Sequence, residues 1–348
     1  MNIKTIEWAN NKVRIIDQTK LPAKLTYLDV HTLKQLWKAI KSLKVRGAPV
    51  LGVVAALGAY LGVKDSKAKN FKELSKQLDK VTKFIASSRP TARNLFWGLE
   101  RAHRVAVENS SKSVSFIKKE ILNEAKKIIE EDRVSCRRIG LYGAKLIHNN
   151  DTILTLCNAG ILATIDYGTA LGVIYRAKEE SKNIRVFACE TRPLLQGARL
   201  TAWELQKKKV NVTLISDNTV AALMREEKIN AVIAGADRIA ANGDTAHKIG
   251  TLNLAILSRY HKIPFYIASP VSTFDLNIKN GKGIIIEERS RNEVAGMYVK
   301  NNVIPEGVGV FNPAFDVTPH NLISAIITDK GIIKNPDRKS IEKLISKS

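Results

Sequence analysis

Two side chains stand where apolar runs of the sequence end, and both carry groups that could move a proton. Cys157 ends the run TILTLC and is followed by Asn-Ala-Gly, whose small side chains leave backbone N–H groups open to a ligand. Asp237 follows the run INAVIAGA, where desolvation is expected to raise the pKa of a carboxyl group. The residues alone leave other interpretations open. Cys157 would then be a buried, inert thiol, and Asp237 would pair with Arg238 or cap the next segment.

Several isolated cations are candidates for binding an anionic group. Arg46 directly precedes Gly47 and Ala48 at the start of a long apolar stretch. Backbone N–H groups at a helix N-terminus bind phosphate, and an adjacent arginine adds positive charge. Arg89 and Lys248 are two further isolated cations. For each of these three residues, the alternative is a charge on a solvated surface.

Motifs for metal binding, disulfides and nucleotide binding are missing from the sequence. The six histidines form no HxxxH or HxH pair, so we expect no metal site. The cysteines (Cys136, Cys157 and Cys189) are odd in number and lack C-x-x-C spacing. This pattern argues against a disulfide scaffold and favours a reducing, cytoplasmic compartment. No GxGxxG or GxxxxGK[ST] motif follows an apolar run, so neither dinucleotide nor P-loop phosphate binding is indicated.

The chain is strongly basic, with 56 Lys and Arg against 33 Asp and Glu, a formal net charge of +23. Charge alone indicates solubility and loose association with anions rather than a particular chemistry. The lysines are scattered over helical patterns without interleaved aromatic residues or a nucleic-acid-binding motif. We therefore expect no nucleic-acid partner.

The elements that position these side chains follow from a change of apolar periodicity along the 348 residues. Residues 3–28 alternate in short pieces, which is typical of antiparallel strands, and residues 31–149 show helical spacing. After residue 150, short apolar runs alternate with helical patterns, which predicts βαβ units around a buried parallel sheet. We expect an α/β protein with a small, mostly helical N-terminal domain (1–125) carrying a short antiparallel sheet and a larger C-terminal domain (126–348) built on the parallel sheet.

No membrane segment is expected. The longest uncharged run, at residues 47–63, is shorter than the roughly 20 apolar residues that a membrane span requires. It predicts a buried core helix instead. Residues 1–20 are broken by charges and lack the apolar segment of a secretory signal.

Small and polar residues follow each apolar run that we interpret as a strand of the parallel sheet. Ligands of such sheets bind beyond the carboxyl ends of the strands. The segments concerned are CNAG (157–160), ETRP (190–193), SDN (216–218), GADR (235–238) and SP (269–270). Each segment is rich in the small and polar residues that a binding crevice requires, so we expect the residues just after the strands to be the informative ones.

These segments, together with others, resemble a known family. The matching segments are RGAP (46–49), SRPTARNLFW (88–97), CNAGILAT (157–164), DYGTALGV (166–173), ETRPLLQGARLTAWEL (190–205), SDNT (216–219), GADRIAANGDTAHKIGT (235–251) and NPAFDVTP (312–319). In this order, over nearly the whole chain, the sequence is similar to the methylthioribose-1-phosphate isomerases. The wider superfamily includes ribose-1,5-bisphosphate isomerase and the regulatory subunits of the translation factor eIF2B.

The resemblance implies a Rossmann-like C-terminal domain, a homodimer and no cofactor. It implies an isomerase of methionine salvage that converts 5-methylthioribose 1-phosphate to 5-methylthioribulose 1-phosphate, with Cys157 and Asp237 as the catalytic residues. The residues that it implies for binding the sugar phosphate are Arg46, Gly47, Ala48, Arg89, Gln196, His247 and Lys248. The chain departs from the family at His247, where the family usually has Asn, and at Leu156 and Cys189, where it often has His and Asp.

Two other functions remain open from the sequence. The first is isomerisation of a related pentose 1-phosphate, either 5-deoxyribose 1-phosphate or ribose 1,5-bisphosphate. The second is a non-catalytic regulatory subunit like those of eIF2B. The presence of both Cys157 and Asp237 argues against the regulator.

Overall fold

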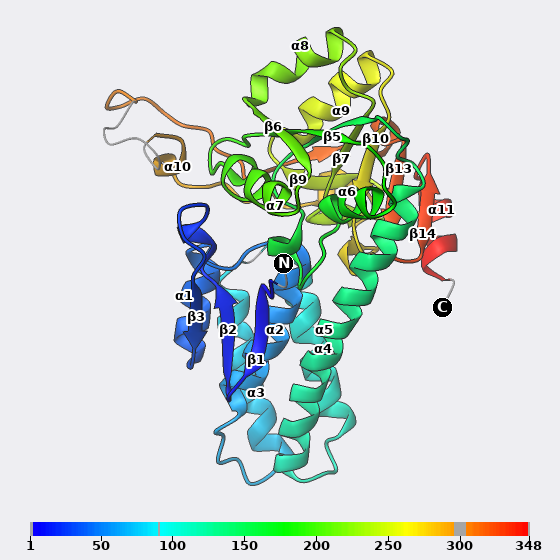
Figure 1. The fold of residues 1–348 in the computed structure, drawn as a ribbon. Helices are drawn as coiled ribbons and strands as arrows, with labels where there is room; N and C mark the ends of the chain where they lie inside the picture. Colours follow the sequence, from blue (N-terminus) through cyan, green and yellow to red (C-terminus); the bar gives the residue numbers. More distant parts are fainter. Residues whose placement is uncertain (1–2, 90, 296–303, 347–348) are drawn as a thin grey trace. The chain divides into compact units, whose positions relative to one another are not determined.

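The chain folds into two compact units. The computed structural model describes residues 3–89, 91–295 and 304–346. The N-terminal unit consists of Asn2–Arg137 and Ile161–Gly168, and the C-terminal unit consists mainly of Arg138–Gly160 and Thr169–Ser348. Helix α5 (Val114–Ala144) runs from the first unit into the second (Figure 1). The domain boundary expected between residues 125 and 126 lies within this helix and stays a prediction.

The N-terminal unit carries a small antiparallel sheet, as the alternation of residues 3–28 predicts. The three strands, in the order β1-β2-β3, are β1 (Ile6–Ala9), β2 (Lys12–Ile16) and β3 (Tyr27–Val30) (Figure 1). Asn10 and Asn11 join β1 to β2, and both have a positive φ, which asparagine tolerates in tight hairpin turns. The turn thereby fixes the register that buries Val13 and Ile15 in the core.

The helices of the N-terminal unit lie where the helical spacing predicts them. They are α1 (Leu33–Lys41), α2 (Ala48–Val63), α3 (Phe71–Ala86), α4 (Arg93–Glu108) and the greater part of α5. Thr32 and Gln35 form a capping box at the start of α1, and the Asn70 side chain caps α3. These caps satisfy amides that have no partner within the helix, so both helices have defined starts.

Helix α2 is the centre of the N-terminal core. Its side chains are buried nearly all round, and it packs against α3 and α4. A helix that is apolar on every face belongs inside a protein core or a membrane. The prediction of a buried core helix is confirmed, and among the described residues no helix is both long and apolar enough to cross a membrane.

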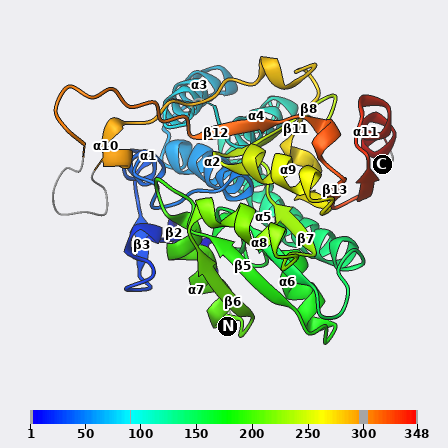
Figure 2. The ribbon, with the colours of Figure 1, turned by 90° about the horizontal axis from the view of Figure 1, so that it is seen from above.

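The C-terminal unit is built on a seven-stranded sheet with the order β14-β13-β10-β7-β4-β5-β6. The strands are β4 (Thr152–Thr155), β5 (Arg185–Cys189), β6 (Asn211–Ile215), β7 (Ala231–Ala234), β10 (Phe265–Ala268), β13 (Ala325–Thr328) and β14 (Gly331–Lys334). All neighbouring pairs are parallel except β13 and β14. The five apolar runs predicted as strands form β4, β5, β6, β7 and β10, so the predicted parallel sheet is confirmed. Figure 2 shows β5 beside β6.

The order of the parallel strands is that of a Rossmann fold. From β4 the chain moves outward through β5 to β6, then crosses to β7 on the other side of β4 and moves outward through β10 to β13. Strand order therefore reverses between β4 and β7. In open α/β sheets, ligands bind in the crevice beyond the carboxyl ends of the strands at such a switch point.

Helices follow or connect the strands of the C-terminal unit. They are α6 (Ala170–Glu179), α7 (Ala202–Lys207), α8 (Val220–Arg225), α9 (Thr251–Tyr260), α10 (Arg291–Ala295) and α11 (Arg338–Ile345). Helix α6 begins at Ala170. Helix α7 is preceded by a π-helical turn over Gly197–Thr201.

A second, four-stranded sheet in this unit has the order β11-β8-β9-β12, and the sequence did not predict it. Its strands are β8 (Arg238–Ala240), β9 (Thr245–Lys248), β11 (Phe274–Asp275) and β12 (Phe315–Thr318). β8 and β9 form an antiparallel hairpin, and β12 pairs with β9. Strands of two to four residues carry too little periodicity to be recognised by alternation.

Candidate active site

Cys157 and Asp237 follow neighbouring strands at the switch point of the sheet. β4 and β7 are paired in parallel, with Thr155 opposite Ile233. Cys157 lies two residues beyond the end of β4, and Asp237 three residues beyond the end of β7. Because both strands run in the same direction, these two residues leave the sheet at the same edge. This is the edge at which the sequence placed the candidate crevice.

Cys157 is a buried thiol in an unusual backbone conformation. Its side chain belongs to the core of the C-terminal unit, and the residue is 6% exposed. Its φ is 62°, in the left-handed region that few residues other than glycine adopt. Strained backbone of this kind concentrates at functional sites. The observation favours a functional Cys157 over an inert thiol.

The other two cysteines are held in the thiol form. Cys189 ends β5 and is fully buried; burial raises its pKa, and the nearby carboxylates of Asp217 and Glu190 raise it further. Burial likewise raises the pKa of Cys136 on α5 well above its ordinary value. A thiol must lose its proton to act as a nucleophile or base. Neither side chain is suited to that role.

Asp237 is paired with His247 across the unpredicted sheet. Asp237 immediately precedes β8, His247 lies on β9, and Nδ1 of His247 is 2.9 Å from Oδ2 of Asp237. The Asp237 side chain is 30% exposed and that of His247 only 6%. The carboxyl group thus has one oxygen fixed by an imidazole while the group stays reachable from outside. The expected rise of the Asp237 pKa stays a prediction.

The edge of the His247 ring that faces away from Asp237 lies at the switch point of the sheet. Its Nε2 is buried and has no hydrogen-bond partner among the described residues. A methyl group built on Gly235 would lie 2.9 Å from the Ala159 side chain and 3.3 Å from Cε1 of His247. The imidazole edge therefore lies where the segments after β4 and β7 come together. A buried polar atom without a partner is an available binding position for a ligand.

Gln196 and Lys248, the other two expected binding residues of this unit, are both buried. Gln196 is 6% exposed, and its Oε1 also has no hydrogen-bond partner among the described residues. Lys248 is 8% exposed, and its ammonium donates to the carbonyl oxygen of Ala314 and lies 4.6 Å from the centre of the Phe315 ring. Gln196 thus offers an open acceptor, whereas the ammonium of Lys248 is anchored to the chain.

Asp316 is a further acidic residue of this site that the sequence did not single out. It lies opposite His247 in the pairing of β12 with β9 and accepts hydrogen bonds from the backbone N–H groups of Gly250 and Leu252. Burial raises the pKa of Asp316, an effect that those two bonds and His247 reduce. Its carboxyl group caps α9 and is therefore already occupied. Only its place in the NPAFDVTP segment hinted at it.

Three expected binding residues form one corner of the N-terminal unit. Gly47 is the N-cap of α2 and has a φ of 114°, and a side chain there would come within 2.6 Å of the Ala163 backbone. Ala48 begins the helix, where no side-chain cap binds the first amides. Nε of Arg46 donates to Gln18, which in turn donates to the Leu162 carbonyl. The arginine and the helix N-terminus together form a cationic cradle.

Arg89 lies in the connection between α3 and α4, the two helices that pack on α2. It is 9% exposed. A buried guanidinium is uncommon unless it binds an acidic partner or a ligand. Of the four expected residues of the N-terminal unit, Arg46, Ala48 and Arg89 are buried and Gly47 is partly buried. The other five expected residues lie in the C-terminal unit.

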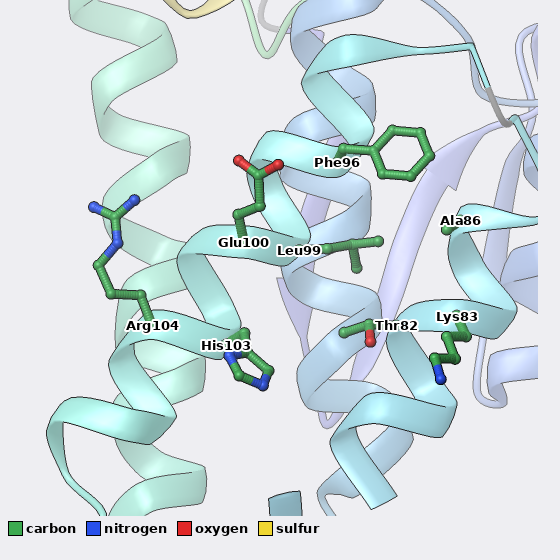
Figure 3. Close-up of a pocket in the computed structure, with 8 residues that line it drawn as sticks. All are labelled: Thr82, Lys83, Ala86, Phe96, Leu99, Glu100, His103 and Arg104. Carbon is green, nitrogen blue, oxygen red and sulfur yellow. The ribbon is translucent and has the colours of Figure 1, made fainter. Parts of the chain in front are cut away.

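A groove of about 400 Å³ in the N-terminal unit contains none of the expected site residues. Figure 3 shows it between α3 and α4. Its lining residues are Thr82, Lys83 and Ala86 from α3, and Phe96, Leu99, Glu100, His103 and Arg104 from α4. Within the described ranges, no group of three or more His, Cys, Asp or Glu side chains is arranged to hold a metal ion. The candidate site is therefore described by its organic side chains and amides.

Comparison with known proteins gives consistent matches over the whole chain. Residues 44–335 match the initiation factor 2 subunit family. The chain is 51% identical to a methylthioribose-1-phosphate isomerase of Geotalea daltonii, over 99% of each chain. It is 50% identical to a 5-deoxyribose 1-phosphate isomerase of Moorella thermoacetica, over 99% of this chain and 98% of that one.

A solved structure agrees with these matches. The 5-methylthioribose 1-phosphate isomerase of Pyrococcus horikoshii OT3 is 42% identical and superposes with a TM-score of 0.88, over 99% of this chain and 96% of that one. The resemblance predicted from the sequence motifs is confirmed, and the protein is an enzyme of the isomerase class. The chain belongs to the initiation factor 2 subunit family, and its full-length relatives include sugar 1-phosphate isomerases.

Proposed function

We propose that the chain converts 5-methylthioribose 1-phosphate to 5-methylthioribulose 1-phosphate, the aldose–ketose step of methionine salvage. The observation that carries the proposal is the arrangement at the switch point. A carboxyl group oriented by an imidazole follows one strand, and a thiol follows the neighbouring strand. The names of the full-length relatives support the same reaction class. We propose a cytoplasmic enzyme that acts without a cofactor.

The substrate itself explains why an acid is needed. Its C1 carries a phosphate, so the sugar cannot open to a free aldehyde and enolise in the usual way. The ring oxygen must be protonated as its bond to C1 breaks. We assign this proton to Asp237, whose partly exposed carboxyl group His247 holds in place. A carboxylic acid that keeps its proton near neutral pH suits this step.

The second step moves hydrogen from C2 to C1 while the 2-hydroxyl group loses its proton and becomes the carbonyl. In one route, a base takes the C2 hydrogen as a proton and returns it to C1. In the other, the hydrogen moves directly as a hydride. Cys157 serves as the base in the first route and as a polarisable wall of a dry pocket in the second; its burial is compatible with both roles.

Reaction in D₂O distinguishes the two routes. A base-carried proton exchanges with solvent and puts deuterium at C1 of the product, whereas a hydride does not. Cys157→Ser raises the ordinary side-chain pKa far above the value near 8.5 of a thiol. Deuterium at C1 together with an inactive Cys157→Ser enzyme supports the base. Absence of deuterium together with a mild loss of activity supports the hydride.

We propose that cationic groups bind the phosphate and that buried acceptor atoms bind the hydroxyl groups of the sugar. The N-terminus of α2 with Arg46 and Arg89 suits the phosphate, since charge-assisted hydrogen bonds are the strong ones. Oε1 of Gln196 and Nε2 of His247 suit the sugar hydroxyl groups, because both atoms are buried without partners among the described residues. We further propose Lys248 as a neighbouring positive charge rather than a direct anchor, because its ammonium binds Ala314.

A second candidate substrate is 5-deoxyribose 1-phosphate. It is favoured by the relative named 5-deoxyribose 1-phosphate isomerase, which is about as similar to this chain as the methylthioribose-1-phosphate isomerase is. The deciding experiment compares kcat/KM for 5-methylthioribose, 5-deoxyribose and ribose 5-phosphate, each as the 1-phosphate. We expect the highest value for 5-methylthioribose 1-phosphate. A higher value for another of the three would reassign the substrate, and no turnover of any would favour a regulatory subunit.

We propose that two copies of the chain form a homodimer. Ile256 and Tyr260 lie four residues apart on α9, and they are 50% and 80% exposed. Residues four apart share one helix face, so these side chains form an uncovered apolar stripe. Light scattering should give twice the mass of 38.5 kDa. An Ile256→Glu chain that dimerises like the unchanged protein would move the interface elsewhere.

A further inference from the structure

The backbone of Cys157 needs support, because a residue with a side chain rarely adopts a φ of 62°. Its N–H donates to Oγ1 of Thr191 at 2.9 Å, and its carbonyl oxygen accepts from Oγ1 of Thr201 at 2.5 Å. Both threonines are fully buried. Each polar group of the Cys157 backbone is therefore bound by a hydroxyl group from the segment that follows β5.

A second layer of side chains fixes the Thr201 hydroxyl group. Nδ2 of Asn158 donates to Oγ1 of Thr201 at 3.2 Å and to Oε1 of Glu204 at 2.9 Å. The other carboxyl oxygen of Glu204 accepts from the Tyr175 hydroxyl group at 2.9 Å. Asn158, Glu204 and Tyr175 are between 2% and 3% exposed. Buried polar networks of this kind hold one arrangement of the chain, since every broken bond leaves a buried group unpaired.

The π-helical turn explains how Thr201 and Glu204 reach this position. The turn covers Gly197–Thr201 and leads directly into α7. Single π turns insert one residue into a helix, and they occur often at functional sites. Thr201 and Glu204 are three residues apart, so they share the helix face that meets Cys157 and Asn158. A side chain on Gly197 would collide with the carbonyl oxygen of Cys189, so the start of the turn has room only for glycine.

We propose that Thr201 and Glu204 are positioning residues that hold Cys157 in its reactive geometry. The inference rests on the proposed role of Cys157 in the isomerase reaction. Neither side chain needs to touch the substrate. Thr201 fixes the Cys157 carbonyl group, and Glu204 fixes Thr201 through Asn158. The direction of the Cys157 side chain then follows from a backbone that cannot relax to an ordinary φ.

The test compares Thr201→Val, which removes the hydroxyl group at similar volume, with Thr201→Ser, which keeps it. The matched control is Thr328→Val on β13, another fully buried threonine whose hydroxyl group binds a backbone carbonyl, that of Gly331. Small misplacements of reacting groups cost up to about a hundredfold in rate. We expect kcat to fall about ten- to a hundredfold in Thr201→Val with KM little changed. Thr201→Ser and Thr328→Val should stay within about threefold of the unchanged enzyme.

Alkylation of Cys157 by iodoacetamide, followed by mass spectrometry of its peptide, gives a readout that does not require turnover. We expect the alkylation rate to change several-fold in Thr201→Val and in Glu204→Gln, and to stay unchanged in Thr328→Val. If the unchanged protein turns over none of the sugar phosphates, the proposed function fails while the alkylation rates still test the positioning.

Equal alkylation rates and equal kcat values in Thr201→Val and Thr328→Val would overturn the proposal. If Thr201→Val does not fold, Tyr175→Phe takes its place, because it removes the hydrogen bond from the Tyr175 hydroxyl group to Glu204. In that case a lower kcat with altered alkylation of Cys157 supports the proposal, and unchanged values of both overturn it.

Discussion

The two units use the same elements, buried helices and short strands, for different purposes. In the N-terminal unit, the expected site residues are cations and helix amides around α2, and they can attract and hold a phosphate. In the C-terminal unit, they are a carboxyl group, an imidazole, an amide, a thiol and an ammonium group, all of which transfer protons or form hydrogen bonds. The contrast supports the proposal that the first unit contributes phosphate-binding groups and that the second carries the catalytic residues.

This division has a physical basis in the two folds. A helix N-terminus supplies several amides and a partial positive charge, so a unit made of helices provides an anion site without special side chains. A parallel sheet places the residues after adjacent strands side by side, as it does for Cys157 and Asp237. Substitutions in the first unit should therefore change KM, and substitutions in the second should change kcat.

The largest effect is expected from Asp237→Asn in the C-terminal unit. The change keeps the shape of the side chain and removes its transferable proton. Loss of general acid catalysis costs about 10²- to 10⁴-fold, and it should appear in kcat with KM little changed. Steady-state kinetics with the preferred sugar 1-phosphate measure both constants. A kcat within about threefold of the unchanged enzyme would remove Asp237 from the role of acid.

Arg89→Ala should affect KM rather than kcat, because it removes a cation from the proposed phosphate site of the N-terminal unit. A charge-assisted hydrogen bond contributes about 1.5–3 kcal/mol, so KM should rise by at least about tenfold while kcat changes little. Arg104→Ala is the control: it removes the same charge from the α3–α4 groove and should leave KM unchanged. Equal KM values in the two variants would place Arg89 outside the phosphate site.

The parts of this arrangement that were predicted from sequence are those with a repeating pattern. The apolar runs before Cys157 and Asp237 indicated two strands of one parallel sheet, and these strands are neighbours. The segment of residues 238–248 gave no such signal, because its two strands are three and four residues long and are separated by a turn. The contact between Asp237 and His247 depends on that hairpin. It could not be derived from spacing alone.

Glu204 shows a second limit of sequence reasoning. In the pattern TAWELQKKK, a glutamate in a helix that ends in lysines is typical of a solvated face. In the structure, Glu204 is 2% exposed, because the π-helical turn rotates α7 so that Glu204 meets Asn158 and Tyr175. A one-residue insertion shifts the apolar register of a helix, but α7 is too short for that shift to be recognised from the sequence. Only the apolar neighbours Trp203 and Leu205 hinted at burial.

A smaller effect is expected from His247→Asn. Asparagine can replace much of the hydrogen bonding of a neutral imidazole, so kcat should stay within about threefold. Steady-state kinetics of the substituted and unchanged enzymes measure kcat and KM. His148→Asn, at a side chain that is 82% exposed, is the control and should leave both constants unchanged. A fall in kcat as large as that expected for Asp237→Asn would show that asparagine cannot replace the imidazole beside Asp237.

The smallest effect on activity is expected from Asp132→Asn, which tests the division between the units with a second carboxyl group. Asp132 lies on α5 in the N-terminal unit and accepts a hydrogen bond from the Ile165 backbone N–H at 2.8 Å. Burial raises its pKa from 3.8 to about 7. An amide oxygen can accept the same hydrogen bond, so kcat should change little, in contrast to Asp237→Asn.

The effect of Asp132→Asn should instead appear in the pH dependence of stability. Between the unfolded pKa of 3.8 and the folded pKa of about 7, the folded chain holds a proton that the unfolded chain has lost. The free energy of unfolding therefore falls as pH rises through this window. Asparagine does not titrate, so the free energy of unfolding of the variant should fall less steeply with rising pH. The variant should therefore gain stability relative to the unchanged protein toward pH 7. Urea unfolding of both proteins at several values from pH 4.5 to 8 measures the difference, which isolates residue 132 from the other groups that titrate in this range. A difference that does not vary with pH would mean that Asp132 loses its proton at the same pH in the folded and unfolded chain.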